Sequence, residues 1–463
     1  MNNIKLCAPL HFLSDSLRLP AGQAGLDLNA KYLLITIILL SSCNTNQPQQ
    51  SEEEMQITFS PKNHSLDNND NFSPEGKFLV YDTRGTVYNN DLANCKSIEK
   101  VEIATGIETV IWEPESITGE QAAPGVAAVS YHPFENKVAF IHGPFLNEVN
   151  QIGYYSKRNR TGVEVSADGE GVLFKLDMRD LNNDPTTPGA HRGGTHRHEY
   201  SRNGKRIGFT YDDHLLQDYD RTIGYMEPNK NAPKDYTHYF SLLVKPVKKG
   251  TSKPSEIEKA HSDSWVDSAG TMRSFIGVVR AENGIDYESS LFVAEIPDEV
   301  DITTAGAGDV ENYPTPAQGI IIRRLTHSNN ADGIVRGSFD GKTIAYFDED
   351  STRVKQVFTI PIDGSDQSQD ADKQPRQLTS FQSNASAIRW HPSDRYILAI
   401  TDGNVVVINV DSGNVDFITN DNKSRSNLVV SPDGKTIAYN IRVEHKDAQK
   451  SFSQIFVKSI DLQ

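Results

Sequence analysis

The phrase Ser431-Pro-Asp-Gly-Lys-Thr-Ile-Ala-Tyr439 decides the fold, because variants of it recur along the whole chain. The other copies begin at Ser73, His132, Ser201, Ser338 and His391, and a degenerate copy runs from Val266 to Gly270. Each copy places a Pro, Asp or Gly turn between two apolar runs, as a tight hairpin requires. Most copies are followed by a further strand and a closing phrase such as Arg376-Gln-Leu-Thr379. A four-stranded unit repeated in this way predicts a β-propeller blade.

The two ends of the chain predict how the ring closes. After its hairpin the last unit has only one more strand, Gln454–Ile460, whereas Met55–Phe59 before the first unit matches the closing phrase. We therefore expect the N-terminal strand to complete the last blade. The predicted fold class is all-β, a single propeller of seven four-stranded blades over residues 55–463. The segment Ser166–Gly169 resembles one more turn phrase, so six or eight blades remain open.

A pair of β-sandwiches is the alternative architecture, since it would also contain short strands and Gly or Asp turns. It does not predict one hairpin phrase recurring across the whole domain. The propeller is therefore the better interpretation.

The segment before the propeller predicts a lipoprotein leader over residues 1–43, of which residues 1–28 are interpreted as an over-extended translation start. Lys31 precedes an apolar run of roughly ten residues, shorter than the roughly twenty that span a bilayer. Leu40-Ser-Ser-Cys43 resembles a lipobox, which predicts acylation of Cys43. Residues 44–54 are too polar to fold and predict a disordered acidic tether. We expect a monomer in the cell envelope, anchored in the outer or inner membrane by lipid alone and facing the periplasm or the cell surface.

Composition and missing motifs exclude several classes of function. The formal net charge of -16 argues against a nucleic-acid partner, whose phosphates require clustered Lys and Arg. After cleavage Cys95 would be the one cysteine of the domain, so no intramolecular disulfide is predicted. The sequence contains no Gly-x-Ser-x-Gly elbow and no phosphate loop. A serine peptidase with an attached propeller is thereby excluded.

The third unit carries the chemistry that stands out, in the stretch His191-Arg-Gly-Gly-Thr-His-Arg-His198. Alternate residues of a strand share a face, which predicts that His196 and His198 point the same way. Gly193 and Gly194 would allow a close approach of the backbone. Such residues could bind a transition metal or supply a general base beside an arginine. A hydrogen-bonded plug of the channel is the structural alternative.

The candidate residues form three groups. The catalytic candidates are His196, His198 and Arg192, and the two histidines are also candidate ligands of a divalent metal (manganese, calcium or zinc). The ligand-binding candidates are His191, Asp212, Asp213, His214, Arg221, Arg84 and Arg336. His132 and His391 replace the Ser of the turn phrase, so we interpret them as structural.

Several stretches are similar to one known family. The segments Gln56–His64, Gly189–His196 and Phe209–His214, together with Ser130-Tyr-His-Pro133, resemble the YidR-like family of uncharacterised TolB-like propellers. The resemblance spans roughly residues 55–463 and implies the fold but no activity. A more distant resemblance links the chain to oligogalacturonate lyases, propellers that use channel His and Arg residues with manganese. The lyase ligands do not align residue by residue with this sequence.

Two hypotheses of function follow. The first is an envelope-anchored binding module that presents its channel mouth to a protein or a glycan, because propellers often serve as rigid platforms. The second is a uronate lyase or another carbohydrate-active enzyme. In that case His196 or His198 would act as base or metal ligand, Arg192 would neutralise a carboxylate, and Asp212 or His214 would complete the site.

Overall fold

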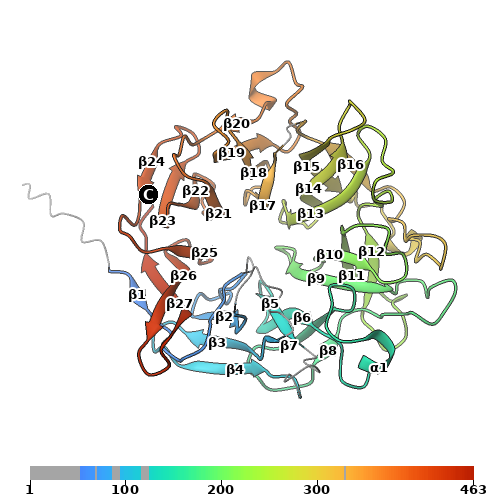
Figure 1. The fold of residues 1–463 in the computed structure, drawn as a ribbon, viewed down its shortest axis with the longest axis horizontal. Helices are drawn as coiled ribbons and strands as arrows, with labels where there is room; N and C mark the ends of the chain where they lie inside the picture. The colour runs from blue at the N-terminus through green and yellow to red at the C-terminus, as the bar shows by residue number, and fades with distance from the viewer. Residues whose placement is uncertain (1–52, 68–69, 86–93, 116–124, 328–329, 463) are drawn as a thin grey trace, which may run out of the picture. The chain divides into compact units, whose positions relative to one another are not determined.

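Seven antiparallel sheets surround a common axis in the computed structural model, which describes residues 53–67, 70–85, 94–115, 125–327 and 330–462 (Figure 1). The named strands of each sheet, from the inside outward, are as follows: blade 1, β2 (Phe78–Asp82), β3 (Ile98–Glu102) and β4 (Glu108–Trp112); blade 2, β5 (Val126–Tyr131), β6 (Lys137–His142), β7 (Thr161–Ser166) and β8 (Phe174–Lys175); blade 3, β9 (Gly193–Tyr200), β10 (Ile207–Asp213), β11 (Thr222–Pro228) and β12 (His238–Leu242); blade 4, β13 (Ile257–Trp265), β14 (Met272–Arg280), β15 (Tyr287–Glu295) and β16 (Ile321–Arg324); blade 5, β17 (Asp332–Gly337), β18 (Thr343–Glu349), β19 (Lys355–Pro361) and β20 (Arg376–Gln377); blade 6, β21 (Ala385–Trp390), β22 (Tyr396–Thr401), β23 (Asn404–Asn409) and β24 (Val415–Phe417); blade 7, β25 (Arg425–Val430), β26 (Thr436–His445), β27 (Lys450–Ser459) and β1 (Met55–Gln56). In blade 1 the inner position belongs to the segment before the first turn phrase, where Ser65 and Phe72 form single bridges to Asp82 and Leu79 of β2. The prediction of a seven-bladed propeller is confirmed.

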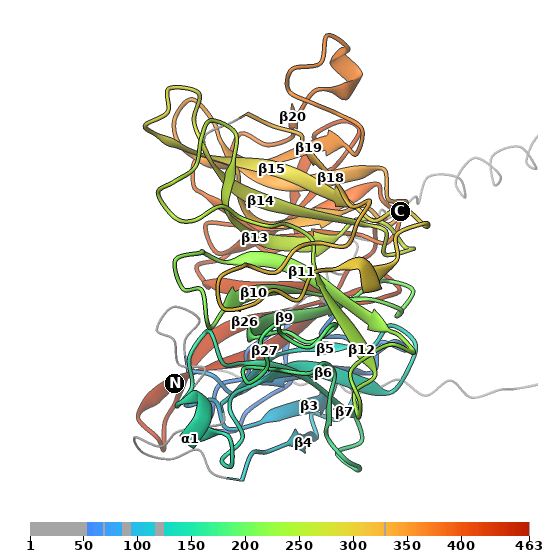
Figure 2. The same cartoon turned by 90° about the vertical axis from the view of Figure 1, so that its right-hand side faces the viewer.

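Few helices accompany the strands. The short helix α1 (Val149–Ile152) lies between β6 and β7, and single 3-10 turns occupy Ile302–Thr304 and Ala371–Lys373. Figure 2 views the ring from the side of blades 3 and 4. Among the described residues, no helix has the length and apolar character needed to cross a bilayer. The predicted leader, including Cys43, lies outside the described residues.

Six turn phrases are held by their first side chain, and the degenerate copy at Val266 is held by Asp267 instead. The hydroxyl of Ser431 accepts the N–H of Thr436 at 2.9 Å and donates to Asp433 at 2.6 Å. Where His replaces Ser, as at His132, the ring Nδ1 accepts the backbone N–H of Glu135 at 3.0 Å. The histidines of the phrase are therefore structural, as the sequence predicts. Ser166–Gly169 forms the turn between β7 and β8 and begins no further blade.

The inner strands share an irregularity. The hydrogen-bond register shifts within β5, β9, β13, β17, β21 and β25. One extra residue forms a β-bulge at each shift, except in β17, where the shift contains two extra residues. A left-handed residue marks the bulge in five of them: Ala128, Arg197, Ser262, Ala387 and Asn427, with φ between 55° and 58°. The bulge changes which side chains face the channel.

One threonine ends each closing phrase in the same way. The hydroxyls of Thr326, Thr379 and Thr419 each accept a backbone N–H from the third strand of their own blade at 2.9 Å. Thr58 does the same for Ile455 of β27 at 2.8 Å, although it lies at the other end of the chain. Met55 and Gln56 pair with Val457 and Phe456. The predicted closure of the ring is thereby confirmed (Figure 1, where β1 lies beside β27).

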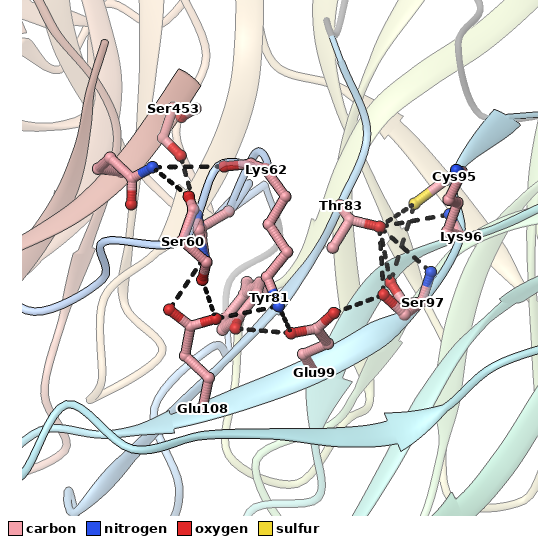
Figure 3. A network of polar contacts seen from close by, with 12 residues as sticks. Ser60, Lys62, Tyr81, Thr83, Cys95, Lys96, Ser97, Glu99, Glu108 and Ser453 are labelled. Atoms are coloured by element: carbon pink, nitrogen blue, oxygen red, sulfur yellow. Dashed lines mark hydrogen bonds and ion pairs between the residues drawn. The ribbon is translucent and has the colours of Figure 1, made fainter. Parts of the chain in front are cut away.

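A polar network seals blade 1 against blade 7 (Figure 3). The Lys62 ammonium lies 2.5 Å from the Glu99 carboxylate and 3.0 Å from that of Glu108. The hydroxyl of Tyr81 also donates to Glu99, at 2.9 Å. His64 is buried there, with its Nδ1 3.1 Å from the carbonyl of Ser453. These contacts fix the segment that leads from β1 into blade 1.

Cys95 lies next to this network and is fully buried. Its Sγ is 3.8 Å from the hydroxyl of Thr83, a contact drawn in Figure 3, and 3.8 Å from the carboxylate of Asp82. Burial, reinforced by the charge of Asp82, raises the pKa of the Cys95 thiol well above its ordinary value. The thiol is therefore kept protonated.

The contribution of the ring closure to the stability of the protein can be tested at Glu54. Its carboxylate accepts hydrogen bonds from Arg425 at 2.7 Å and Tyr439 at 2.7 Å, and it pairs with Lys423. We expect Glu54→Gln to lower the free energy of unfolding by about 1–3 kcal/mol at pH 7, since it weakens hydrogen bonds made by a charged group. Chemical denaturation measures the change. The exposed neighbour provides the control, because Glu53→Gln should change little.

The same substitution predicts a pH dependence. Burial would raise the pKa of Glu54, but its hydrogen bonds from Lys423, Tyr439 and Arg425 outweigh burial and hold that pKa below about 4.5. A depressed folded pKa contributes stability above the unfolded pKa, and this contribution disappears as the pH falls through the folded value. The stability difference between parent and Glu54→Gln should therefore shrink below about pH 4.5. A difference that stays constant down to pH 3 would contradict this assignment.

Candidate functional site

Arg192 and Asp213 form a buried ion pair inside blade 3. The Arg192 Nε donates to the Asp213 carboxylate at 2.9 Å, and both side chains have zero exposed area. The Arg192 Nη1 donates to the backbone carbonyl of Asp309, in the β15–β16 connection. Asp213 also accepts the hydroxyl of Tyr211 and the N–H of Leu215, both at 2.9 Å. The pair fastens a long loop of blade 4 to blade 3.

His191 lies in the apolar interior of the same blade. Its Nε2 is 3.6 Å from the carboxylate of Asp177, and its ring packs against Phe240 at 5.6 Å between centroids. Burial, together with the charge of Arg179, lowers the pKa of His191 well below its ordinary value. Burial also raises the pKa of Asp177 to about 7. The surroundings favour the uncharged form of each group.

His196 and His198 do not share a face, because the bulge at Arg197 interrupts the alternation of β9. His198 is fully buried, with its Nε2 3.0 Å from the hydroxyl of Thr195. Burial lowers the pKa of His198 to about 3. His196 is half-buried, and its pKa is held low first by burial and then by Arg160 and other nearby arginines. The predicted alternation is therefore wrong, and the two rings have different surroundings.

Gly193 and Gly194 allow a close approach, but the group that approaches them is backbone of the same protein. A Cβ added to Gly193 would lie 2.2 Å from the carbonyl oxygen of Asp212, and one added to Gly194 would lie 2.2 Å from that of Lys157. The carboxylate of Asp212 is paired with Arg221 at 2.8 Å and with Lys157 at 3.2 Å. These residues tie the start of β9 to its neighbours.

Two further candidates lie near this end of the inner strands. Arg84 is buried between the carboxylates of Asp82 and Asp67, 2.6 Å from Asp67. His214 is half-buried, and its backbone N–H donates to the carbonyl of Arg192 at 3.2 Å. Over the part of the chain that the structure describes, no three His, Cys, Asp or Glu side chains converge as metal ligands.

Arg336 lies apart from the other candidates, in a cavity at the opposite end of the inner strands. This cavity, here called the turn-side cavity, has a volume of about 340 Å³ and receives residues from all seven blades. Its polar lining residues are Asp70, His132, Glu199, Ser201, Arg202, Ser264, Arg336, Arg389 and Ser431. Its aromatic and proline lining residues are Phe72, Pro74, Tyr131, Pro133, Phe134, Tyr200, Trp265, Phe339, Trp390, Pro392 and Pro432. The wall contains no other residue of the predicted site.

Tryptophans hold the wall of the turn-side cavity together. The indole N–H of Trp265 in blade 4 donates to the carbonyl of Glu199 in blade 3 at 3.0 Å. That of Trp390 in blade 6 donates to the carbonyl of Arg336 in blade 5, also at 3.0 Å. Each buried indole thus satisfies its one polar group on the preceding blade. These two indole hydrogen bonds therefore fix both the aromatic wall and the spacing between adjacent blades.

Two guanidinium groups in the cavity lack full sets of partners. The Nε and Nη2 of Arg336 have no hydrogen-bond partner among the described residues, and its Nη1 donates to the carbonyl of Val335 at 3.0 Å. The Nε of Arg389 likewise has none, and its Nη1 donates to the carbonyl of Ile388 at 2.7 Å. Burial and then the charge of Arg389 lower the pKa of Arg336 well below its ordinary value. Buried charges without partners are costly, which makes this pair a candidate for binding a ligand.

Carboxylates of the cavity are engaged or partly protonated. Glu199 accepts from the Arg273 guanidinium at 2.9 Å and from the hydroxyl of Ser264 at 2.7 Å. Burial, followed by the charge of Glu199, raises the pKa of Asp70 to about 7. Among the described residues, no ion pair joins Arg336 or Arg389 to a carboxylate. The centre of the cavity therefore has an excess of positive charge.

Sequence reasoning predicted Arg336 and missed Arg389 and the aromatic wall. The position of Arg389 in its repeat could have identified it, since both arginines lie two residues before the first residue of a turn phrase. The residue immediately before the phrase is aromatic in five blades: Phe72, Tyr131, Tyr200, Trp265 and Trp390. Aligning the copies on that position would have revealed the cavity.

Comparisons with known proteins identify a family and a relative of this chain. A family model described as a protein of unknown function (DUF3748) matches residues 125–238. The uncharacterized protein YidR of Escherichia coli (strain K12) is 31% identical over 423 residues, which cover 84% of this chain and 95% of the relative.

Solved structures with similar coordinates are more remote. A TolB from Agrobacterium tumefaciens has 14% identity and a TM-score of 0.38, over 79% of this chain and 98% of the other. The TolB of Acinetobacter baumannii has 11% identity and a TM-score of 0.36, over 84% and 81% of the two chains. A prolyl endopeptidase structure has 11% identity and a TM-score of 0.46, over 87% of this chain and 50% of the other.

The role of Arg192 can be tested by stability. We expect Arg192→Met to lower the free energy of unfolding by about 3–5 kcal/mol, because it leaves the buried Asp213 carboxylate without its cation. Denaturant titration followed by far-UV circular dichroism measures the loss. Lys205→Met, at an exposed position of the same blade, is the control and should change little. An Arg192→Met variant as stable as the parent would refute the structural role.

Proposed function

The chain belongs to the YidR family, and on that premise we propose that it is an envelope-anchored binding module that holds a protein or glycan ligand in the turn-side cavity. The observation that carries the proposal is the cavity itself. Its wall is drawn from every blade, half of its lining residues are aromatic or proline, and these surround buried polar groups such as Arg336 and Arg389. Such a combination is typical of ligand sites in proteins.

A binding role fits the geometry better than the lyase alternative. A lyase needs its base and its carboxylate-binding arginine beside one open space. Arg192 is instead engaged by Asp213, and His198 lies in the interior between blades 2 and 3, where a Cβ added to Gly162 would lie 2.5 Å from its Nε2. None of these side chains lines the turn-side cavity. We therefore propose no catalytic step.

The envelope anchor is part of the proposal and has a direct test. The lipobox-like sequence ending at Cys43 supports acylation of that cysteine. We expect Cys43→Ser to abolish labelling of the protein with radioactive palmitate in bacterial cells and to move the protein from the membrane fraction to the soluble fraction. Ser42→Ala, which keeps the thiol and a small residue, is the matched control. Unchanged labelling and fractionation in Cys43→Ser would refute the anchor.

An uncharged apolar probe tests the cavity as a binding site. In full-length protein carrying Cys43→Ser, which requires no detergent if the anchor is lost, N-phenyl-1-naphthylamine should bind and increase in fluorescence. Phe134 and Phe339 are 70% and 40% exposed and belong to the cavity lining. Because each offers apolar surface to an occupant, we expect Phe134→Ala and Phe339→Ala each to weaken binding about fivefold.

The matched controls are exposed phenylalanines that do not line the cavity. Phe174 and Phe417 are 61% and 55% exposed, and Phe174→Ala and Phe417→Ala should leave probe affinity unchanged. Equal losses in all four variants, or no probe binding to the parent, would exclude the turn-side cavity as the ligand site.

A further inference from the structure

We propose that the turn-side cavity binds the free C-terminal carboxylate of a peptide with an apolar last residue, and that Arg336 and Arg389 are its anion-binding pair. This inference rests on the proposed function, because it names the chemistry of the ligand for the same cavity. It assigns a task to the two guanidinium groups that the fold leaves without full sets of partners.

The unmet hydrogen-bonding capacity of the arginines indicates the charge of the ligand. Arg336 is 5% exposed, yet its Nε and Nη2 have no acceptor among the described residues, and neither has the Nε of Arg389. The two side chains come from adjacent blades and line one cavity. A carboxylate offers two oxygens to such N–H groups, and charge-assisted bonds of this kind are strong. The pair is therefore suited to an oxyanion.

The third arginine of the cavity lining, Arg202, is already engaged. Its guanidinium donates to the carbonyls of Ser338 at 2.6 Å and Gly337 at 2.7 Å and lies over the ring of Phe339. Arg273, which is not part of the lining, is held by Asp263 and Glu199. Arg202 thus stabilises the wall, and the contrast isolates Arg336 and Arg389 as the groups available to a ligand.

The apolar wall indicates what carries the carboxylate. The charged centre is surrounded by Trp265, Trp390 and the prolines at the second position of the turn phrases, such as Pro392 and Pro432. A sugar would bring hydroxyl groups against this wall, and burying a hydroxyl without a partner is costly. An apolar residue that ends in a carboxylate matches both the wall and the centre.

The rim of the cavity favours a peptide chain over a small carboxylic acid as the ligand. Phe134 and Phe339 belong to the lining and remain exposed, so an occupant that extends out of the cavity can cover them. The lining also contains no residue from the opposite ends of the inner strands, where Arg84 and Asp212 lie. A peptide would enter from the turn side and end at the two arginines, which is why we assign a chain terminus.

The test compares one peptide in two chemical forms. The probe is acetyl-glycyl-alanyl-phenylalanine with a free C-terminal carboxylate, and its partner is the same peptide as the carboxamide. Isothermal titration of the full-length Cys43→Ser protein should show the acid binding at least about tenfold tighter than the amide. This comparison needs no variant of the cavity.

Variants then assign the preference to the two arginines. We expect Arg336→Met and Arg389→Met each to bring the acid-to-amide ratio close to one. Each should also leave the melting temperature unchanged or raise it, because removing a buried charge without partners relieves a cost. A purely structural arginine would instead lower the melting temperature on replacement. Arg395→Met is the control, because Arg395 is exposed and lies in blade 6 with Arg389. This variant should preserve the acid-to-amide ratio.

Other outcomes would overturn the inference in distinct ways. Equal affinity for acid and amide in the parent, with N-phenyl-1-naphthylamine still bound, would remove the carboxylate assignment and leave the binding module standing. Benzoate or trigalacturonate binding as tightly as the peptide acid would replace the peptide by a small acid or an acidic sugar. Failure of every probe would remove both proposals.

Discussion

The pairing of β1 with β27 is the contact on which the rest of the structure depends. A single small sheet is marginal alone, and a ring of sheets is stable only when its first and last members are joined. Thr58 makes the bond in blade 7 that Thr326, Thr379 and Thr419 make in their own blades. The N-terminal strand therefore completes the last blade by the same chemistry as an internal strand. The turn-side cavity follows from that closure, since its wall needs all seven blades at one end of the axis.

The cavity combines a rigid wall with an electrostatically unfavourable centre. Indole hydrogen bonds from Trp265 and Trp390 fix neighbouring blades, and apolar side chains surround them. Burial among these side chains raises the free-energy cost of the Arg336 and Arg389 charges. A ligand that supplied hydrogen-bond acceptors to these guanidinium groups would offset that cost, which is the physical basis of the proposed binding role.

The sequence predicted the blades because hairpin chemistry is local: a Ser or His, a turn and an apolar run specify each unit within about ten residues. It also predicted the closure, because Met55–Thr58 resembles the internal closing phrases. The site was harder. The alternation that placed His196 beside His198 fails at the bulge of Arg197, which no short motif announces. Arg336 was identified as a candidate, but its partnership with Arg389 depends on the neighbouring blades being placed around one axis.

The buried thiol of Cys95 has a practical consequence. Electrophilic reagents react with thiolates, and burial keeps this sulfur both inaccessible and protonated. Within the part of the chain that the structure describes, Cys95 is the one cysteine. In a protein in which Cys7 and Cys43 are also replaced, a cysteine engineered at the rim of the turn-side cavity would therefore accept a maleimide dye at a single chosen position, and the propeller could serve as an optical sensor for its own ligand.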